Sequence, residues 1–161
     1  MRRLVAPLLL SLGLLATPVV QGSPASAAEP AAKPAGVAAR VKKALHVAER
    51  QVGDPYRYGA EGPRRFDCSG LVWFATHRAG FDGVPRTSAE QGDYMRRIKR
   101  SHLRRGDFVF FTEKGTVYHV GIYVGRRDGD RTILHAPRTG ERVGRDPIWT
   151  DKWFAATLRG V

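Results

Sequence analysis

Three residues in this sequence carry the side chains that nucleophilic catalysis needs. Cys68 is the only cysteine among the 161 residues, so it has no disulfide partner within the chain. A thiolate can attack a carbonyl carbon, and a histidine beside it can accept the thiol proton and later donate it to a leaving amine. His119 and His135 lie in VYHVGIYV and RTILHA, two predicted strands that would bring them side by side if they pair. The three residues predict a Cys-His-His site in which His119 is the base and His135 holds its ring.

The neighbours of Cys68 favour a reactive thiol over a buried structural one. In RRFDCSGLVWF, the polar residues Asp67 and Ser69 make an apolar pocket around the thiol unfavourable. Asp67 also stands at the N-cap position of a predicted helix that begins at Cys68. A helix N-terminus is the positive end of the helix dipole and carries unpaired amides, so we expect it to lower the pKa of the thiol.

Helices are expected in the first half of the chain. Apolar residues at steps of three and four predict a helix over 37–52. A second helix is predicted over 68–79, with Gly80 as its C-terminal glycine. Thr87 and Glu90 match a capping box at the start of a third helix.

Beyond Lys99 the sequence changes to β-branched and aromatic runs separated by turns rich in Gly and Asp. The predicted strands cover 107–111, 117–124, 131–136 and 154–161. The Asp-Gly turn in RRDGD predicts an antiparallel hairpin from the second and third runs. Helices followed by strands, without alternation, predict an α+β fold with N-terminal helices packed on a central antiparallel sheet.

Alternation along the second predicted strand sorts its side chains between two faces. Val120 and Ile122 belong to a core-like face, whereas His119 and Gly121 point the other way. Glycine weakens a strand, so Gly121 indicates that another group comes close to this face. We expect the helix that begins at Cys68 to lie opposite the histidines.

The N-terminal residues 1–28 have the layout of a cleavable secretory signal. Arg2 and Arg3 precede an apolar stretch, LVAPLLLSLGLLATPVV, and the small residues of PASAAE follow. Prolines and a glycine interrupt the stretch and no basic stop-transfer flank follows it, so no stable membrane anchor is expected. Residues 29–36, EPAAKPAG, predict a linker, and residues 37–161 predict one catalytic domain in a secreted protein.

The chain is strongly basic, with 27 Lys and Arg against 15 Asp and Glu and a formal net charge of +12. Such a charge favours polyanionic partners, and for an exported protein an anionic cell wall is a better candidate than nucleic acid. No aromatic-interleaved surface of the kind that binds nucleic acid is recognisable. The densest basic run contains Arg96, Arg97, Lys99, Arg100, Arg104 and Arg105. This run is either a contact surface for carboxylates or phosphates of the wall or simply a solvated surface.

Six segments in a fixed order carry a resemblance to a known family. PYRYG, FDCSGLVWF, VPRTSAEQ, LRRGDFVFF, HVGIYVG and LHAPRTG lie between about Ala44 and Ile148. Together they resemble the NlpC/P60 family of papain-like cysteine peptidases, which cut stem peptides of bacterial peptidoglycan. The resemblance implies a papain-like fold and an acyl-enzyme mechanism on a stem-peptide amide, most often that between γ-D-glutamate and the diamino acid. We expect a monomer that is secreted, as residues 1–28 indicate, and associated with the cell wall, where it acts on peptidoglycan or muropeptides without metal or organic cofactor.

The resemblance also implies roles for single residues near the thiol. Tyr56, in PYRYG, matches a tyrosine whose hydroxyl helps the oxyanion or the substrate, and the backbone amide of Cys68 would be the other oxyanion donor. Asp67 and Ser69 match positions that recognise a free N-terminal amine in some relatives. Ala60 stands where the family often has a second glycine, and we expect this change to affect only the shape of the loop.

Other functions remain open at this point. A wall amidase of the same fold is an alternative to the endopeptidase. A non-catalytic wall-binding module is another, and it predicts that Cys68→Ala leaves function intact. A zinc site built from Cys68, His119 and His135 is a third alternative, although the spacing is not a usual zinc pattern.

Overall fold

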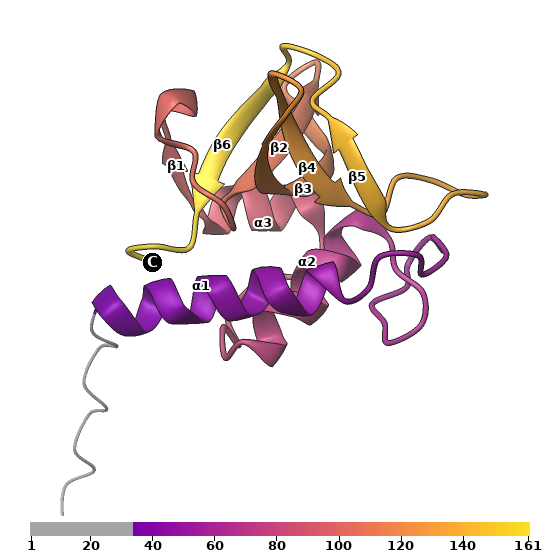
Figure 1. Ribbon diagram of the computed structural model, residues 1–161, viewed down its shortest axis with the longest axis horizontal. Coiled ribbons are helices and arrows are strands. Elements are labelled where there is room, and N and C mark those ends of the chain that lie inside the picture. Colours follow the sequence, from indigo (N-terminus) through magenta and orange to yellow (C-terminus); the bar gives the residue numbers. More distant parts are fainter. Residues whose placement is uncertain (1–33) are drawn as a thin grey trace, which may run out of the picture. The chain divides into compact units, whose positions relative to one another are not determined.

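An antiparallel sheet with helices on one face forms the part of the chain that the structure, a computed structural model, describes (Figure 1). That part is residues 34–161. The helices are α1 (Pro34–Glu49), α2 (Cys68–Arg78) and α3 (Ser88–Tyr94), with a 3-10 turn, η1, at Arg100–His102. The strands are β1 (Arg96–Ile98), β2 (Phe108–Glu113), β3 (Thr116–Arg127), β4 (Asp130–His135), β5 (Gly144–Pro147) and β6 (Trp153–Thr157). The predicted α+β fold, with helices before strands, is confirmed.

The strands lie in the order β1-β6-β2-β3-β4-β5, and each neighbouring pair is antiparallel. β3 and β4 form the predicted hairpin, in which Ile122 pairs with Leu134 and Tyr123 with Ile133. The sequence pattern does not predict the edge strands β1 and β5, because RRI and GRDP are short and largely charged. The strand β5 therefore adds residues beside β4 that the sequence prediction does not place there.

The larger hydrophobic core lies between the helices and one face of the sheet. Val41 of α1 and Leu71 of α2 pack in the same cluster as Phe110, Val120 and Ile122. The predicted core face of β3 is therefore confirmed. A smaller core on the other face of the sheet consists of Val109, Phe111, Tyr123, Ile133, Trp153 and Ala155.

Local signals set the ends of α2 and α3. Oδ1 of Asp67 accepts a hydrogen bond from the amide of Gly70 at 2.6 Å, so Asp67 is the predicted N-cap of α2. Gly80 follows α2 with a φ of +91°, a left-handed conformation that favours glycine. Thr87 and Glu90 form the predicted capping box of α3. These signals fix where the first turn of α2 stands, and that turn carries the thiol.

The structure covers only part of the segments predicted at the N-terminus. α1 begins at Pro34 and so includes residues 34–36, which the sequence pattern assigns to the linker 29–36. The rest of that linker and the signal sequence predicted over residues 1–28 lie outside the described residues. Within residues 34–161, none of the helices combines the length and the apolar character that crossing a bilayer requires.

Candidate active site

The three residues predicted to be catalytic line one pocket. Cys68 is the first residue of α2, His119 lies in β3, and His135 is the last residue of β4. The pocket has a volume of about 620 Å³. Its other lining residues are Tyr56, Tyr118, Pro137, Arg138, Glu141, Asp146, Pro147 and Trp149. The fold thus brings together a thiol and two imidazoles that lie far apart in the sequence.

The thiol approaches the histidines from the side of the helical core. α2 packs on the face of β3 that carries Val120 and Ile122. His119 points to the other face, where its ring centre is 5.6 Å from that of Phe111 in the smaller core. The body of this helix therefore packs on the face of β3 that His119 does not occupy, although Cys68 at its start lines the same pocket as both histidines. The Cys68 thiol lies beside the backbone of Val120, one residue along β3 from His119.

Gly121 faces the same side of β3 as His119 and makes room for a neighbouring strand. A Cβ at this position would lie 2.6 Å from Cδ1 and 3.1 Å from Cβ of Ile133. Real Cβ atoms essentially never come as close as the first of these distances. The predicted close approach at Gly121 is confirmed, and the approaching group is the Ile133 side chain of β4.

A chain of hydrogen bonds runs from His119 to an aspartate. His119 Nε2 is 2.8 Å from Nδ1 of His135, and both side chains are buried. His135 Nε2 is 2.8 Å from Oδ2 of Asp146. Because an ionised carboxylate only accepts hydrogen bonds, His135 donates through Nε2 and accepts at Nδ1. His119 then donates through its own Nε2, which leaves its Nδ1 lone pair free to take a proton.

Asp146 is a functional residue that the sequence prediction missed. It lies in β5, which pairs with β4 so that Asp146 is opposite Ile133 and Gly144 is opposite His135. Its side chain is 54% exposed, so the carboxylate remains accessible to solvent while it holds a buried ring. A carboxylate in a strand next to the one that carries His135 is the signal for this residue, and it is visible only once β5 is known.

Burial dominates the electrostatics of the thiol. It raises the pKa of the Cys68 thiol above its ordinary value, and the Asp67 carboxylate acts in the same direction. Contacts with the backbone at Val120 and at the start of α2 lower the pKa without offsetting the burial. The predicted backbone effect therefore exists, but the predicted net lowering of the pKa of Cys68 is wrong. At Cys68 the backbone contacts of the helix N-terminus do not compensate for the loss of hydration of the partly buried thiolate.

The imidazoles are kept uncharged. Burial, and then the neighbouring His135, lower the pKa of His119 to about 3. Burial also lowers the pKa of His135, although Asp146 and Glu141 act against it. At neutral pH the resting site therefore holds a thiol and neutral imidazoles rather than a thiolate–imidazolium pair.

Trp149 covers the histidine pair from one side. Its ring stacks on Phe111 with centroids 4.0 Å apart and planes 4° from parallel. Its centroid is 5.6 Å from those of both His119 and His135. An apolar ring in this position excludes water from the imidazoles and so contributes to the burial that lowers their pKa values. The sequence offers no pattern that distinguishes this tryptophan from the other two.

Asp67 and Ser69 form a separate network with Arg86. Nη1 of Arg86 is 3.0 Å from both Oδ1 of Asp67 and Oγ of Ser69, and Nη2 is 2.8 Å from Oδ2 of Asp67. The Asp67 carboxylate also accepts the backbone amides of Gly59 and Gly70. Both of its oxygens are thus occupied, and neither Asp67 nor Ser69 lines the pocket. Recognition of a substrate amine by these two residues stays a prediction, and the contacts do not favour it.

Tyr56 lines the pocket beside the thiol. Burial raises the pKa of its phenol, and the charges of Cys68 and Asp67 act in the same direction. The hydroxyl therefore remains a hydrogen-bond donor at neutral pH. A donor on this wall of the pocket is compatible with the predicted oxyanion role, which stays a prediction.

The described residues contain no set of ligands that would support the zinc alternative. Across residues 34–161, no group of three or more His, Cys, Asp or Glu side chains is arranged so that it could hold a metal ion. Cys68 and the two histidines thus line one pocket without forming a metal cage. The hydrogen bond between the two histidines also occupies the nitrogens that would face each other across a shared ion.

The side chains of the basic run at 96–105 make separate contacts. The Arg97 guanidinium lies 3.9 Å above the ring of Phe154. Arg105 forms an ion pair with Glu49 at 3.0 Å. Contact between this run and anionic wall polymers stays a prediction.

Comparison with known proteins gives a family match and curated relatives. A sequence model of the NlpC/P60 family matches residues 53–161. Murein DD-endopeptidase MepH of Escherichia coli (strain K12) is 40% identical over 126 residues, which cover 71% of this chain and 44% of MepH. Probable endopeptidase YafL of the same organism is 38% identical over 122 residues, which cover 70% of this chain and 47% of YafL. The chain thus spans about half the length of these curated relatives.

Two solved structures with the same fold are peptidoglycan hydrolases by name. The NlpC/p60 domain of peptidoglycan hydrolase SagA superposes with a TM-score of 0.64 and 26% identity, covering 73% of this chain and 98% of that domain. Peptidoglycan hydrolase RipB from Mycobacterium tuberculosis gives a TM-score of 0.64 and 26% identity, covering 79% of this chain and 68% of RipB.

Proposed function

Because the chain belongs to the NlpC/P60 family, we propose that it is a cysteine endopeptidase that hydrolyses amide bonds in peptidoglycan stem peptides. One observation carries this proposal. Cys68 shares a pocket with His119, and His119 begins a hydrogen-bonded chain through His135 to Asp146. A thiol, a base with a free nitrogen and a partner that holds the base are the parts that acyl transfer requires.

In this mechanism Nδ1 of His119 takes the thiol proton while Sγ of Cys68 attacks the amide carbon. Both groups are uncharged beforehand, so charge develops only as the new C–S bond forms. The imidazolium that forms keeps its Nε2–H bond to His135, and the Asp146 carboxylate supports it from behind. The backbone amide of Cys68 and the hydroxyl of Tyr56 receive the oxyanion.

Collapse of the tetrahedral intermediate breaks the C–N bond. The imidazolium of His119 donates its proton to the departing amine, and a thioester to Cys68 remains. Water then attacks the thioester carbon and gives one proton to His119, which returns it to the sulfur as the acid product leaves. Every proton in these steps moves between named side chains, substrate and water, so they need no metal or organic cofactor.

Two bonds are candidates for cleavage. The first is the amide between γ-D-glutamate and the diamino acid, as the family resemblance implies. The second is a bond between two D-configured residues, which is favoured by the similarity to MepH, a murein DD-endopeptidase by name. An amidase reaction at the glycan–peptide junction is a third outcome of the same test.

Mass analysis of muropeptides digested by the wild type and by Cys68→Ala tests this function. We expect fragments only from the wild type, and their masses identify the bond. Cys68→Ser is a matched control, because it puts a hydroxyl of similar shape in place of the thiol and so removes the thiol nucleophile. Identical fragments from the wild type and Cys68→Ala would overturn the mechanism. If neither protein produces fragments while both bind the peptides, the chain is a binding module.

The proposal includes a location outside the cytoplasm, at the cell wall. Its support is the charge and apolar layout of residues 1–28 and the wall substrate. N-terminal sequencing of the protein recovered from culture medium or cell wall tests it. We expect the recovered chain to begin after residue 28, whereas recovery of residues 1–28 on the protein would count against the cleaved signal.

A further inference from the structure

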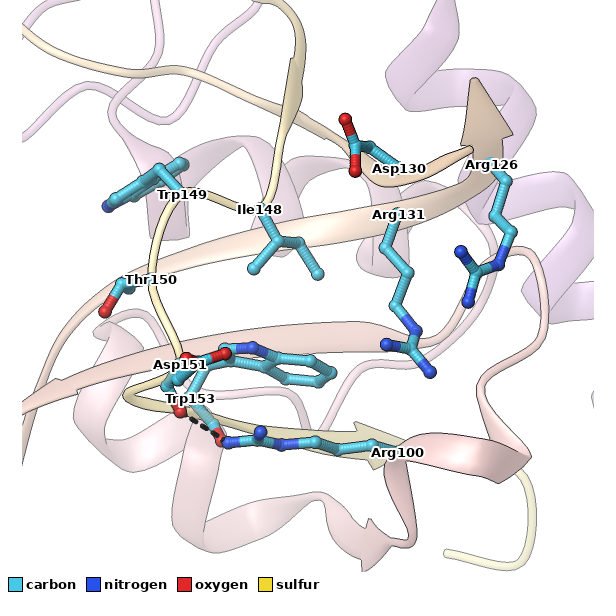
Figure 2. Close-up of a pocket in the computed structure, with 9 residues that line it drawn as sticks. All are labelled: Arg100, Arg126, Asp130, Arg131, Ile148, Trp149, Thr150, Asp151 and Trp153. Carbon is cyan, nitrogen blue, oxygen red and sulfur yellow. Dashed lines mark hydrogen bonds between the residues drawn. The ribbon is translucent and has the colours of Figure 1, made fainter. Parts of the chain in front are cut away.

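A second pocket, of about 370 Å³, shares Trp149 with the pocket that the thiol lines. Its lining combines three arginines with two tryptophans, an isoleucine, a threonine and two aspartates: Arg100, Arg126, Arg131, Trp149, Trp153, Ile148, Thr150, Asp130 and Asp151 (Figure 2). The arginines come from η1, the end of β3 and the start of β4. Only one of the three belongs to the basic run at 96–105, so folding rather than sequence produces this cluster.

The three guanidinium groups differ in what they already bind. Arg100 donates to the carbonyls of Asp151 at 2.6 Å and Trp153 at 2.5 Å, and its guanidinium lies 4.2 Å from the ring of Trp153. Arg126 donates to the carbonyl of Gly129 in its own turn. Some N–H donors of Arg100 and Arg126 are therefore already bound to backbone carbonyls of the protein.

The N–H donors of the Arg131 guanidinium remain available to a ligand. Its half-buried guanidinium points into the pocket between Arg126 and the ring of Trp153, 5.9 Å from that ring (Figure 2). Among the described residues it neither donates a side-chain hydrogen bond nor forms an ion pair. A guanidinium has five N–H donors in a planar fork that matches a carboxylate, so this arrangement is suited to a planar anion.

The charge of the pocket suits a single anionic group. Three guanidiniums and the carboxylates of Asp130 and Asp151 leave a net charge of +1. No carboxylate within residues 34–161 pairs with any of the three arginines, so the positive charges are available to a ligand. A polyanionic phosphate chain would meet the two aspartates, whereas one carboxylate is balanced by the net charge.

Trp149 connects this pocket with the active site, because it belongs to the lining of both. Resting on the proposed function, we propose that the arginine pocket binds a free carboxylate of the peptidoglycan stem peptide whose scissile amide occupies the pocket of Cys68. Trp149 is then the wall over which the substrate passes between the two pockets. Arg131 makes the bidentate contact, and Arg100 and Arg126 contribute charge.

Equilibrium binding of muropeptides in the Cys68→Ala background tests this inference without requiring turnover. The muropeptides are used in two forms, with free carboxylates and after conversion of their carboxylates to amides with carbodiimide and ammonium. Arg131→Gln is the test variant. Arg127→Gln is its matched control, because it makes the same charge change at the last residue of β3, on an exposed side chain paired with Asp128.

We expect amidation to weaken binding to the parent about 10-fold, the usual scale for loss of a charge-assisted bidentate contact. Arg131→Gln should weaken binding of the free form by a similar factor and be nearly insensitive to amidation, whereas Arg127→Gln should behave as the parent. The inference would be overturned if the ratio of the affinities for the free and the amidated muropeptides were the same in Arg131→Gln as in the parent. Selective loss of binding to phosphate-rich wall, with that ratio unchanged, would overturn the carboxylate assignment in favour of a phosphate.

The same variants in the active enzyme separate this inference from the proposed function. If the wild type and Cys68→Ala give identical digests, the proposed function fails even where the binding ratios hold. A different result would overturn the carboxylate subsite alone. In that case the wild type cleaves, and the ratio of kcat/KM for free to amidated muropeptides is the same in Arg131→Gln as in the wild type.

Discussion

The carboxylate of Asp146 lies 2.8 Å from Nε2 of His135, and this contact sets the tautomer of a second histidine that Asp146 does not touch. With its Nε2 proton held by Asp146, His135 can only accept at Nδ1. His119 must therefore donate through Nε2, and the lone pair of its Nδ1 is left free. A partly exposed residue on an edge strand thus determines which nitrogen of a buried residue can accept a proton.

Replacing Asp146 by Asn should lower kcat by about 10- to 100-fold, as loss of a residue that orients a catalytic ligand commonly does. The Asn amide can donate as well as accept, so the tautomer of His135 is no longer specified. KM should change little, because Asp146 acts through His135. Steady-state kinetics with Asp82→Asn as the control, which makes the same change at an exposed residue outside both pockets, would measure this. Equal kcat in the wild type and Asp146→Asn would show that the tautomer does not depend on this contact.

Alkylation of Cys68 by iodoacetamide should be slow at neutral pH and should rise with pH to a plateau only above about pH 9, because burial raises the pKa of the thiol above its ordinary value of 9.0. The rate constant as a function of pH, followed by mass spectrometry of the only cysteine, gives this pKa. A plateau that begins below pH 7 would instead indicate a preformed thiolate–imidazolium pair. His119→Asn separates the two cases further, since it should leave the alkaline profile in place.

The free energy of unfolding should fall as the pH drops below 6.5. His119 has a pKa of about 3 in the folded protein against 6.5 as its ordinary value, so the unfolded chain takes up the proton first. Stability from this group is complete above pH 6.5 and is lost progressively as the pH falls toward 3, by about 1.4 kcal/mol per pH unit at most.

Urea denaturation of the wild type and His119→Asn at pH 7 and 5.5 measures this effect above the range where most carboxylates titrate. The wild type should lose roughly 1 kcal/mol more than the variant over this interval. Parallel behaviour of the two proteins would mean that His119 is not held in its neutral form by burial.

Replacement of Arg86 should destabilise the fold far more than replacement of Glu61, its more exposed ion-pair partner. Arg86→Ala removes the cation from the carboxylate of Asp67, whose side chain is only 10% exposed, and should destabilise the fold by about 3 kcal/mol. Glu61 meets the same guanidinium, but its side chain is 51% exposed, so Glu61→Gln should cost less than about 1 kcal/mol. Thermal denaturation of both variants compares the two ion pairs at one arginine. Similar losses would indicate that burial of Asp67 does not govern the network.

Gly121→Ala should destabilise the protein by about 1–3 kcal/mol, because the new methyl group collides with Cδ1 of Ile133. Ile133→Val removes that atom, so the double variant should recover part of the loss relative to Gly121→Ala. Denaturation midpoints of the two single variants and the double variant form a cycle that measures the coupling. Additive effects in that cycle would exclude the collision as the cause.

The sequence alone determined the features that depend on near neighbours along the chain. Asp67, Gly80 and the Thr87–Glu90 pair predict helix ends correctly, because a cap and a helix terminus lie within a few residues of each other. The hairpin of β3 and β4 follows from a turn of local composition, and it brings His119 beside His135. Residue types also sufficed to single out a thiol and two imidazoles that share one pocket.

Tertiary structure decided what depends on register and burial across the sheet. Asp146 joins the site only because β5, a short charged edge strand, pairs with β4. The pKa of Cys68 is raised rather than lowered, because packing removes water from the thiol by more than the helix N-terminus compensates. Arg131 meets Arg100 only through the sheet and η1. Hydration and long-range pairing are properties of the packed chain, and no local run of residues carries them.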